Sequence, residues 1–153
     1  MASIEETRTV VGEDATTFES LNPATGEVVG TFPIDREVAV RFAVERARGA
    51  SEWWRSIGFD GRAQHLASYK AELARRMDEL ADLIHRENGK PRADAILEIT
   101  LVLDHLSWAT GHARKVLAPR SVFPGVMALN NSASVEYQPL GVVGVIGPWN
   151  YPV

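Results

Sequence analysis

The residues best suited to chemistry in this sequence form the segment Gly147-Pro148-Trp149-Asn150-Tyr151-Pro152. It directly follows Gly141-Val142-Val143-Gly144-Val145-Ile146, whose continuous apolar and β-branched residues predict a strand buried on both faces of a parallel sheet. Open α/β sheets bind ligands at the carboxyl ends of their strands, where this segment would lie. Composition alone leaves a simpler interpretation open, in which the prolines and glycine form a tight turn and the aromatic rings cover the sheet edge.

Other residue types with catalytic or metal-binding chemistry give weaker signals. The chain has no cysteine, which excludes a disulfide framework, a thiolate metal site and a cysteine nucleophile within these residues. His105 and His112 could share a helix face, but no further ligands accompany them, so we predict no metal site. Trp53-Trp54 and Trp108 are typical of packing rather than of a stacking platform for bases. Neither a Gly-x-Gly-x-x-Gly motif nor a Gly-x-Ser-x-Gly elbow is present.

The charge balance narrows the possible partners. Sixteen Lys and Arg stand against 20 Asp and Glu, a formal net charge of −4, and the two signs are mixed along the chain. Binding to nucleic acid or to an anionic membrane needs a basic surface, so we expect neither partner. The N-terminus lacks the basic and apolar regions of a secretion signal, and no apolar stretch is long enough to cross a bilayer. We therefore expect a cytoplasmic protein.

The elements that must position the terminal segment begin with a hairpin. Residues 1–16 are polar and aperiodic, which predicts a flexible arm. Two β-prone runs, residues 17–21 and 27–32, flank Asn22-Pro23-Ala24-Thr25-Gly26, and proline followed by glycine across such a gap indicates a turn.

Three helices are predicted next. Asp35 can cap the first, whose buried stripe has the spacing of Val40, Ala43, Val44 and Ala47. Asp60 can cap the second, which ends where Gly89 supplies a left-handed stop. Pro91 suits the first turn of the third, which runs to Pro119. We expect the two long helices to pack antiparallel across the Gly-Lys-Pro turn.

The pattern changes after Pro119. Turn residues are followed by an alternating β-prone run at 134–137 and then by the buried strand. We therefore divide the chain into an arm (1–16), a hairpin and helical part (17–119), a β segment (120–139) and the strand with its loop (140–153). A parallel strand needs a crossover and a neighbour, so either this strand pairs elsewhere or the chain is incomplete.

Three segments together resemble the aldehyde dehydrogenase superfamily. They are Leu21-Asn22-Pro23-Ala24-Thr25-Gly26-Glu27-Val28, Glu87-Asn88-Gly89-Lys90-Pro91, and Pro139-Leu140 with the strand and loop that follow to Pro152. The third is specific, and its order and distance from the other two agree with the family. The resemblance implies the N-terminal part of an aldehyde-dehydrogenase-like α/β fold: a β-hairpin, amphipathic helices, then the first strand of a doubly wound parallel sheet. It covers about the first third of a family member.

The resemblance also assigns roles. Asn150 is similar to the family's oxyanion residue, whose amide N–H stabilises the charge that forms on the carbonyl oxygen. Ile146, Gly147, Pro148 and Trp149 match the stretch beside the nicotinamide half of the cofactor. Tyr151 matches an aromatic position that lines the entry tunnel for the aldehyde. Residues 120–139 match a β-arm through which subunits associate, which implies a homodimer or homotetramer.

The implied reaction is oxidation of a small-molecule aldehyde to a carboxylic acid with NAD or NADP, through a cysteine thioester. The family's nucleophilic cysteine, its glutamate that activates water and its glycine loop for the pyrophosphate have no match in these residues. The hypothesis is therefore an N-terminal portion of an NAD(P)-dependent aldehyde dehydrogenase that is inactive alone. Two alternatives stay open: a stand-alone helical interaction module, and an acylating relative that lacks the hydrolytic step.

Overall fold

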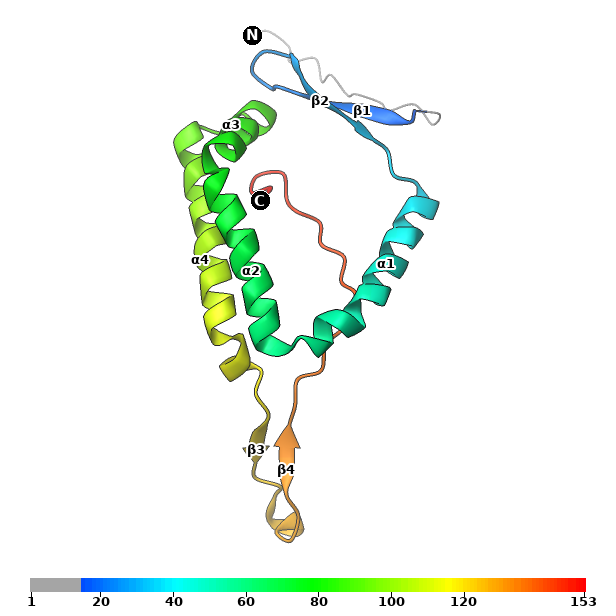
Figure 1. The fold of residues 1–153 in the computed structure, drawn as a ribbon, viewed down its shortest axis with the longest axis vertical. Coiled ribbons are helices and arrows are strands. Elements are labelled where there is room, and N and C mark those ends of the chain that lie inside the picture. The colour runs from blue at the N-terminus through cyan, green and yellow to red at the C-terminus, as the bar shows by residue number, and fades with distance from the viewer. Residues whose placement is uncertain (1–14) are drawn as a thin grey trace, which may run out of the picture.

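The protein is described by a computed structural model covering residues 15–153. The predicted arm, residues 1–16, therefore lies almost wholly outside the described residues. The remainder is helix-rich, with two short antiparallel hairpins at opposite ends of the longest axis (Figure 1). No helix within residues 15–153 combines the length and the apolar character that crossing a membrane requires.

The first hairpin is confirmed. Strands β1 (Thr17–Leu21) and β2 (Val28–Pro33) pair antiparallel, with Phe18 opposite Phe32 and their ring centroids 5.6 Å apart. The turn closes through the Gly26 N–H, which donates to the Asn22 carbonyl at 2.8 Å. Gly26 has a φ of 75°, which a residue without Cβ adopts at no steric cost.

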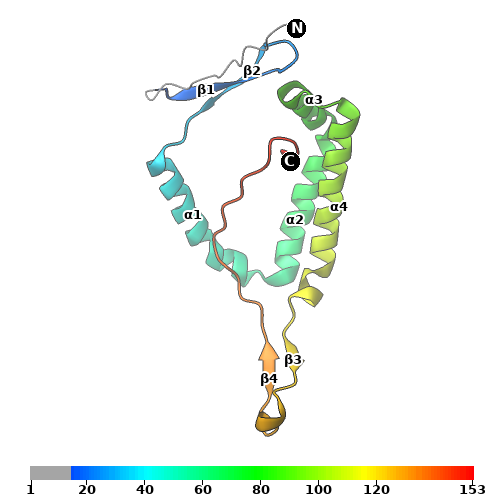
Figure 2. The same cartoon turned by 180° about the vertical axis from the view of Figure 1, so that it is seen from behind.

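Four α-helices follow, where three were predicted: α1 (Glu37–Ser56), α2 (Gly58–Arg75), α3 (Met77–Asn88) and α4 (Arg92–Val116). The predicted second helix is two helices, because the backbone leaves helical geometry at Arg76 (φ −99°, ψ 15°). Both α2 and α3 pack against α4, and α2 runs antiparallel beside it (Figures 1 and 2). The predicted antiparallel packing across the turn is thus confirmed.

The predicted helix starts are wrong in detail. The residue before α1 is Arg36, without a side-chain cap, so Asp35 does not cap it. Asp60 lies inside the first turn of α2, where its charge suits the helix dipole, and its carboxylate pairs with Arg114 at 2.6 Å. Pro91 precedes α4 as its N-cap rather than occupying its first turn.

The core lies where α3 meets the first half of α4. Four apolar side chains are buried among the described residues, namely Ala81, Ile84, Ala95 and Ile99. One charged residue, Glu98, is buried with them at 2% exposure. The packing role predicted for the tryptophans holds only for Trp54, which is half-buried with its ring 6.0 Å from that of His65; Trp53 and Trp108 are 52% and 57% exposed.

The chain after α4 forms a second hairpin and then loses regular structure. Strands β3 (Arg120–Val122) and β4 (Ala133–Val135) pair antiparallel around a short 3₁₀ turn, Val126–Ala128. The predicted strand at 141–146 is wrong for this chain: these residues have no strand hydrogen bonds and are exposed, Ile146 at 97%. A strand forms only beside a partner, and no strand of the described residues lies beside this one.

Helix α1 flanks this irregular stretch. Its apolar stripe is not buried as predicted; with Val142 and Val143 it lines an open groove of about 300 Å³. Both views show residues 139–153 running between α1 on one side and α2 with α4 on the other (Figures 1 and 2). The stripe therefore faces the segment that the sequence predicts as a strand.

Candidate functional site

The terminal loop, residues 147–153, lies against the helix turn, residues 88–91, which connects α3 to α4. The turn is set by Gly89, which ends α3 in the left-handed conformation (φ 75°) and donates its N–H to the His85 carbonyl at 3.0 Å. The His85 ring then donates from Nδ1 to the Lys90 carbonyl at 2.6 Å. These local bonds fix the backbone from which Asn88 and Lys90 reach the terminal loop.

Lys90 is the centre of the contact. Its Nζ donates to the backbone carbonyl of Asn150 at 2.6 Å and to the Glu98 carboxylate, and it lies 4.2 Å from the centroid of the Tyr151 ring. An ammonium group has three N–H donors. A carbonyl, a carboxylate and an aromatic face therefore give each donor a partner, two of them from the terminal loop.

Glu98 completes the contact from the first turns of α4. Its Oε2 accepts from Lys90, and its Oε1 accepts the backbone N–H of Val153 at 3.0 Å. Asn88 adds a third attachment, since its side-chain Nδ2 donates to the Trp149 carbonyl. The Lys90 and Glu98 side chains are 12% and 2% exposed, so this ion pair is shielded from water.

The candidate catalytic residue has a fixed backbone and a free amide. The Asn150 carbonyl is held by Lys90, and no hydrogen bond engages the Asn150 side chain within residues 15–153. The loop turns tightly at this point, because the Tyr151 N–H donates to the Pro148 carbonyl at 3.3 Å. An amide group on an anchored backbone can donate to an incoming oxygen without first breaking a bond.

The other predicted site residues lie on both sides of Asn150. Ile146 and Trp149 are 97% and 84% exposed, and a Cβ added at Gly147 would lie 3.6 Å from the Pro152 carbonyl, an ordinary contact distance. Pro148 accepts the bond that closes the turn. Tyr151 keeps 56% of its surface exposed while its ring covers Lys90. The structure brings these residues together as one loop, and their assigned roles stay predictions.

Sequence reasoning missed Asn88, Lys90 and Glu98 as residues of the site. Asn88 and Lys90 entered the sequence analysis only as part of the segment 87–91 that resembles the family. Glu98 was only one polar residue within a predicted amphipathic helix. The one available signal was the position of Glu98 on the apolar side of α4, next to Ile99. A carboxylate there needs a cationic partner.

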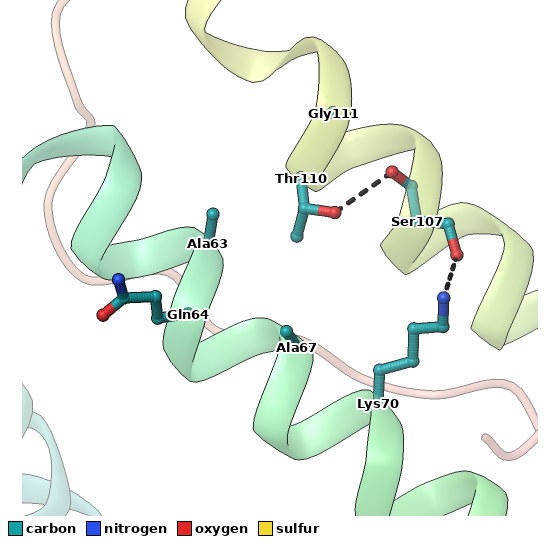
Figure 3. A pocket seen from close by; sticks show the side chains of 7 residues that line it. All are labelled: Ala63, Gln64, Ala67, Lys70, Ser107, Thr110 and Gly111. Carbon is teal, nitrogen blue, oxygen red and sulfur yellow. Dashed lines mark hydrogen bonds between the residues drawn. The ribbon is translucent and has the colours of Figure 1, made fainter.

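An open hollow of about 520 Å³ lies away from this site. It lies between α2 and α4 and is lined by Ala63, Gln64, Ala67, Lys70, Ser107, Thr110 and Gly111 (Figure 3). Lys70 crosses it to donate to the Ser107 hydroxyl at 2.6 Å, so its charged group already has a partner. None of its lining residues belongs to the helix turn or the terminal loop. No three His, Asp or Glu side chains gather as a metal site anywhere in the part of the chain that the structure describes.

A sequence model described as the aldehyde dehydrogenase family matches residues 10–153. The chain belongs to the aldehyde dehydrogenase family. It is similar to the 4,4'-diapolycopene aldehyde oxidase of a Methylomonas species, 34% identical over 139 residues, which are 90% of this chain and 26% of the relative. It is equally similar to malonate-semialdehyde dehydrogenase 2 of Oceanobacillus iheyensis, 34% identical over 148 residues, which are 97% of this chain and 29% of the relative.

The solved structures give the same family. NADP-dependent glyceraldehyde-3-phosphate dehydrogenase from Bacillus halodurans, complexed with NADP, superposes with a TM-score of 0.78 and 27% identity. The match covers 90% of this chain and 29% of that one. The predicted fold class, the N-terminal part of an aldehyde-dehydrogenase-like α/β fold, is confirmed. The chain spans less than a third of the length of these family members.

Aldehyde dehydrogenases use a dinucleotide, and the terminal loop fits one part of such a site. Residues 146–149 present an exposed backbone and the exposed faces of Ile146 and Trp149, which can contact a flat ring by shape. The 153 residues contain no glycine-rich loop of the kind that holds a pyrophosphate. The surfaces of Ile146 and Trp149 are therefore accessible to a ligand, and the glycine-rich part of a dinucleotide site is not among these residues.

Proposed function

We propose that this chain is the N-terminal portion of an NAD(P)-dependent aldehyde dehydrogenase in which Asn150 donates to the developing oxyanion. The observation that carries the proposal is the geometry of Asn150, an anchored backbone bearing an amide without a partner among residues 15–153. The same residue lies within the region that matches the family. Neighbouring Ile146, Gly147, Pro148 and Trp149 would line the cofactor, and Tyr151 the path of the aldehyde.

The chemistry explains why an amide suits this position. When a thiolate adds to an aldehyde, the C–S bond forms and the carbonyl electron pair moves to oxygen, which becomes negative. A neutral N–H donor stabilises that charge over a wide pH range, because the amide does not titrate. Loss of one such donor typically lowers turnover by about 10²–10³-fold. The bound NAD or NADP would accept the hydride that the aldehyde carbon loses.

The thiolate is expected outside these 153 residues, because the chain contains no cysteine. The resemblance to the family implies that the water-activating carboxylate lies outside them as well. The proposal therefore concerns the complete reading frame, and the 153 residues alone should be inactive. The name of the Oceanobacillus relative makes a carboxylate-bearing semialdehyde the first substrate to test. The β3–β4 hairpin would serve as the subunit-association arm of a homodimer or homotetramer, since its tip exposes apolar residues such as Met127 at 99% and Val126 at 74%.

The test is to express the complete reading frame and follow reduction of NAD and of NADP with a panel of semialdehydes and uncharged aldehydes. We expect one cofactor to be reduced, with a kcat that falls by about 10²–10³-fold in Asn150→Ala. A wild-type kcat in that variant, or no activity with any aldehyde, would contradict the proposal.

Product analysis completes the test. A free acid supports the hydrolytic reaction. Formation of a thioester with added coenzyme A would instead assign the protein to the acylating branch of the fold.

A further inference from the structure

The buried ion pair between Lys90 and Glu98 contacts three groups of the terminal loop. Lys90 binds the Asn150 carbonyl, Glu98 binds the Val153 N–H, and the Tyr151 ring covers the Lys90 ammonium group. The Asn88 side chain donates a further hydrogen bond to the Trp149 carbonyl. Four of the five residues from 149 to 153 are thus contacted by Asn88, Lys90 or Glu98. These contacts are long-range, since Lys90 and Asn150 are 60 positions apart in the sequence.

The charges of the pair require this arrangement. Burial of a carboxylate and an ammonium group is strongly unfavourable unless they are paired and form additional hydrogen bonds. In this structure the two partners satisfy each other only in part, and the backbone of the terminal loop supplies the rest. If the loop moved away, Lys90 and Glu98 would still pair with each other, but each would lose the hydrogen bond that the loop backbone supplies.

We propose that Lys90 and Glu98 are positioning residues for catalysis: their buried pair, together with Asn88, fixes the backbone of residues 149–153 and so directs the Asn150 amide toward the oxyanion. This inference rests on the proposed function. It assigns a role to Asn88-Gly89-Lys90, a segment that the aldehyde oxidation chemistry itself does not use.

Positioning of this kind acts on turnover more than on binding. A donor displaced by about 1 Å from the oxyanion can lower the rate by up to about 10²-fold, whereas the aldehyde and the cofactor keep most of their contacts. Substitution of Lys90 should therefore lower kcat and leave KM for the aldehyde within about twofold of wild type, the pattern of an interaction made only in the transition state.

The experiment uses the protein encoded by the complete reading frame and a double-mutant cycle. We expect Lys90→Met to lower kcat by about 10–100-fold, and Asn150→Ala to lower it further. If Lys90 acts through Asn150, adding Lys90→Met to Asn150→Ala should change kcat by less than about threefold. Independent effects that multiply in the double variant would overturn the inference.

Two further variants separate positioning from simple stability. Lys90→Met with Glu98→Leu replaces the pair by apolar side chains of similar size, which should restore the melting temperature without restoring kcat, because the bond to the Asn150 carbonyl is still missing. A restored kcat would overturn the inference. Arg92→Gln is the matched control: it removes the exposed contacts of Arg92 with Asp82 and Asp78, 2.6 and 2.7 Å away, and should leave kcat unchanged.

Hydrogen exchange gives a readout independent of activity. A peptide covering residues 147–153 should exchange faster in Lys90→Met than in wild type, and Arg92→Gln should match wild type. If exchange is unchanged in Lys90→Met, the inference is overturned and the proposed function stands. The same holds if the wild type is active and Lys90→Met keeps its kcat. A wild type that oxidises no aldehyde overturns the proposed function and the inference with it.

Discussion

Two adjacent stretches of the chain differ sharply in how they are held. Residues 147–153 are attached to the helix turn and to α4 through Asn88, Lys90 and Glu98. Residues 141–146 directly precede them, are more apolar, and are exposed, with Val145 at 88% and Ile146 at 97%. The more polar stretch is hydrogen-bonded to the helices, and the apolar one has no strand partner among the described residues.

The difference follows from where each stretch obtains its hydrogen bonds. Helices satisfy their backbone groups internally, so α3, α4 and the turn between them form a scaffold within this chain. Side chains on that scaffold reach the backbone of the terminal loop. A parallel strand instead takes its bonds from neighbouring strands, which require crossover connections of a dozen or more residues. The loop is therefore held by helices even though no strand pairs with the stretch before it.

The largest expected effect comes from breaking the buried pair in the 153-residue chain. Lys90→Met leaves Glu98, 2% exposed, with no cationic partner, and removing one member of a buried pair typically costs about 3–5 kcal/mol of unfolding free energy. Urea titration followed by circular dichroism measures it. A loss under about 1 kcal/mol would mean that the terminal loop is not held as described.

Gly89→Ala should have the next largest effect. The residue sits at φ 75°, and an added Cβ would lie 2.9 Å from Cγ of Pro23 in the β1–β2 turn. The left-handed conformation alone costs a residue with a Cβ about 1–2 kcal/mol. Thermal melting of this variant should be compared with that of Gly49→Ala, which lies inside α1 at a position with open space and should be neutral or stabilising. Equal melting temperatures for the two variants would argue against the turn geometry.

Val145→Ala probes the exposed stretch. In the 153-residue chain it should change the unfolding free energy by no more than about 0.5 kcal/mol, because the side chain is already 88% exposed. In the protein from the complete reading frame, where the sequence predicts a buried strand at 141–146, the same substitution should cost about 1–3 kcal/mol. Equal values in the two proteins would show that this stretch stays unpaired in both.

The same contrast explains what could be predicted from the sequence. The hairpin at 17–33 and the long helices follow from local patterns, turn residues and apolar spacing, and they are found nearly where they were expected. The loop carrying Asn150 was singled out by its position after the apolar run, and its roles were assigned by the resemblance to the family. The attachment of this loop to Lys90 and Glu98 was not recognised, because contacts between residues 55 and 60 positions apart leave no periodic signal in a single sequence. The strand at 141–146 was predicted from a pattern that describes burial in a sheet, and the sheet is not formed by these residues.

We expect the smallest effect on stability from breaking an exposed ion pair, which is compared here with the buried Lys90–Glu98 pair. Arg76 donates to Glu79 near the α2–α3 junction, and this hydrogen bond lowers the pKa of the Glu79 carboxyl below its usual value. A carboxyl whose pKa is lowered by folding adds stability above its unfolded pKa, and that stability is lost as the pH falls through the folded pKa. Both side chains are largely exposed, at 43% and 62%, so solvent and salt screen the interaction. Glu79→Gln should therefore flatten the acid side of the pH–stability curve slightly at low salt and have no effect at high salt. An effect as large as that of Lys90→Met would mean that burial is not what separates the two pairs.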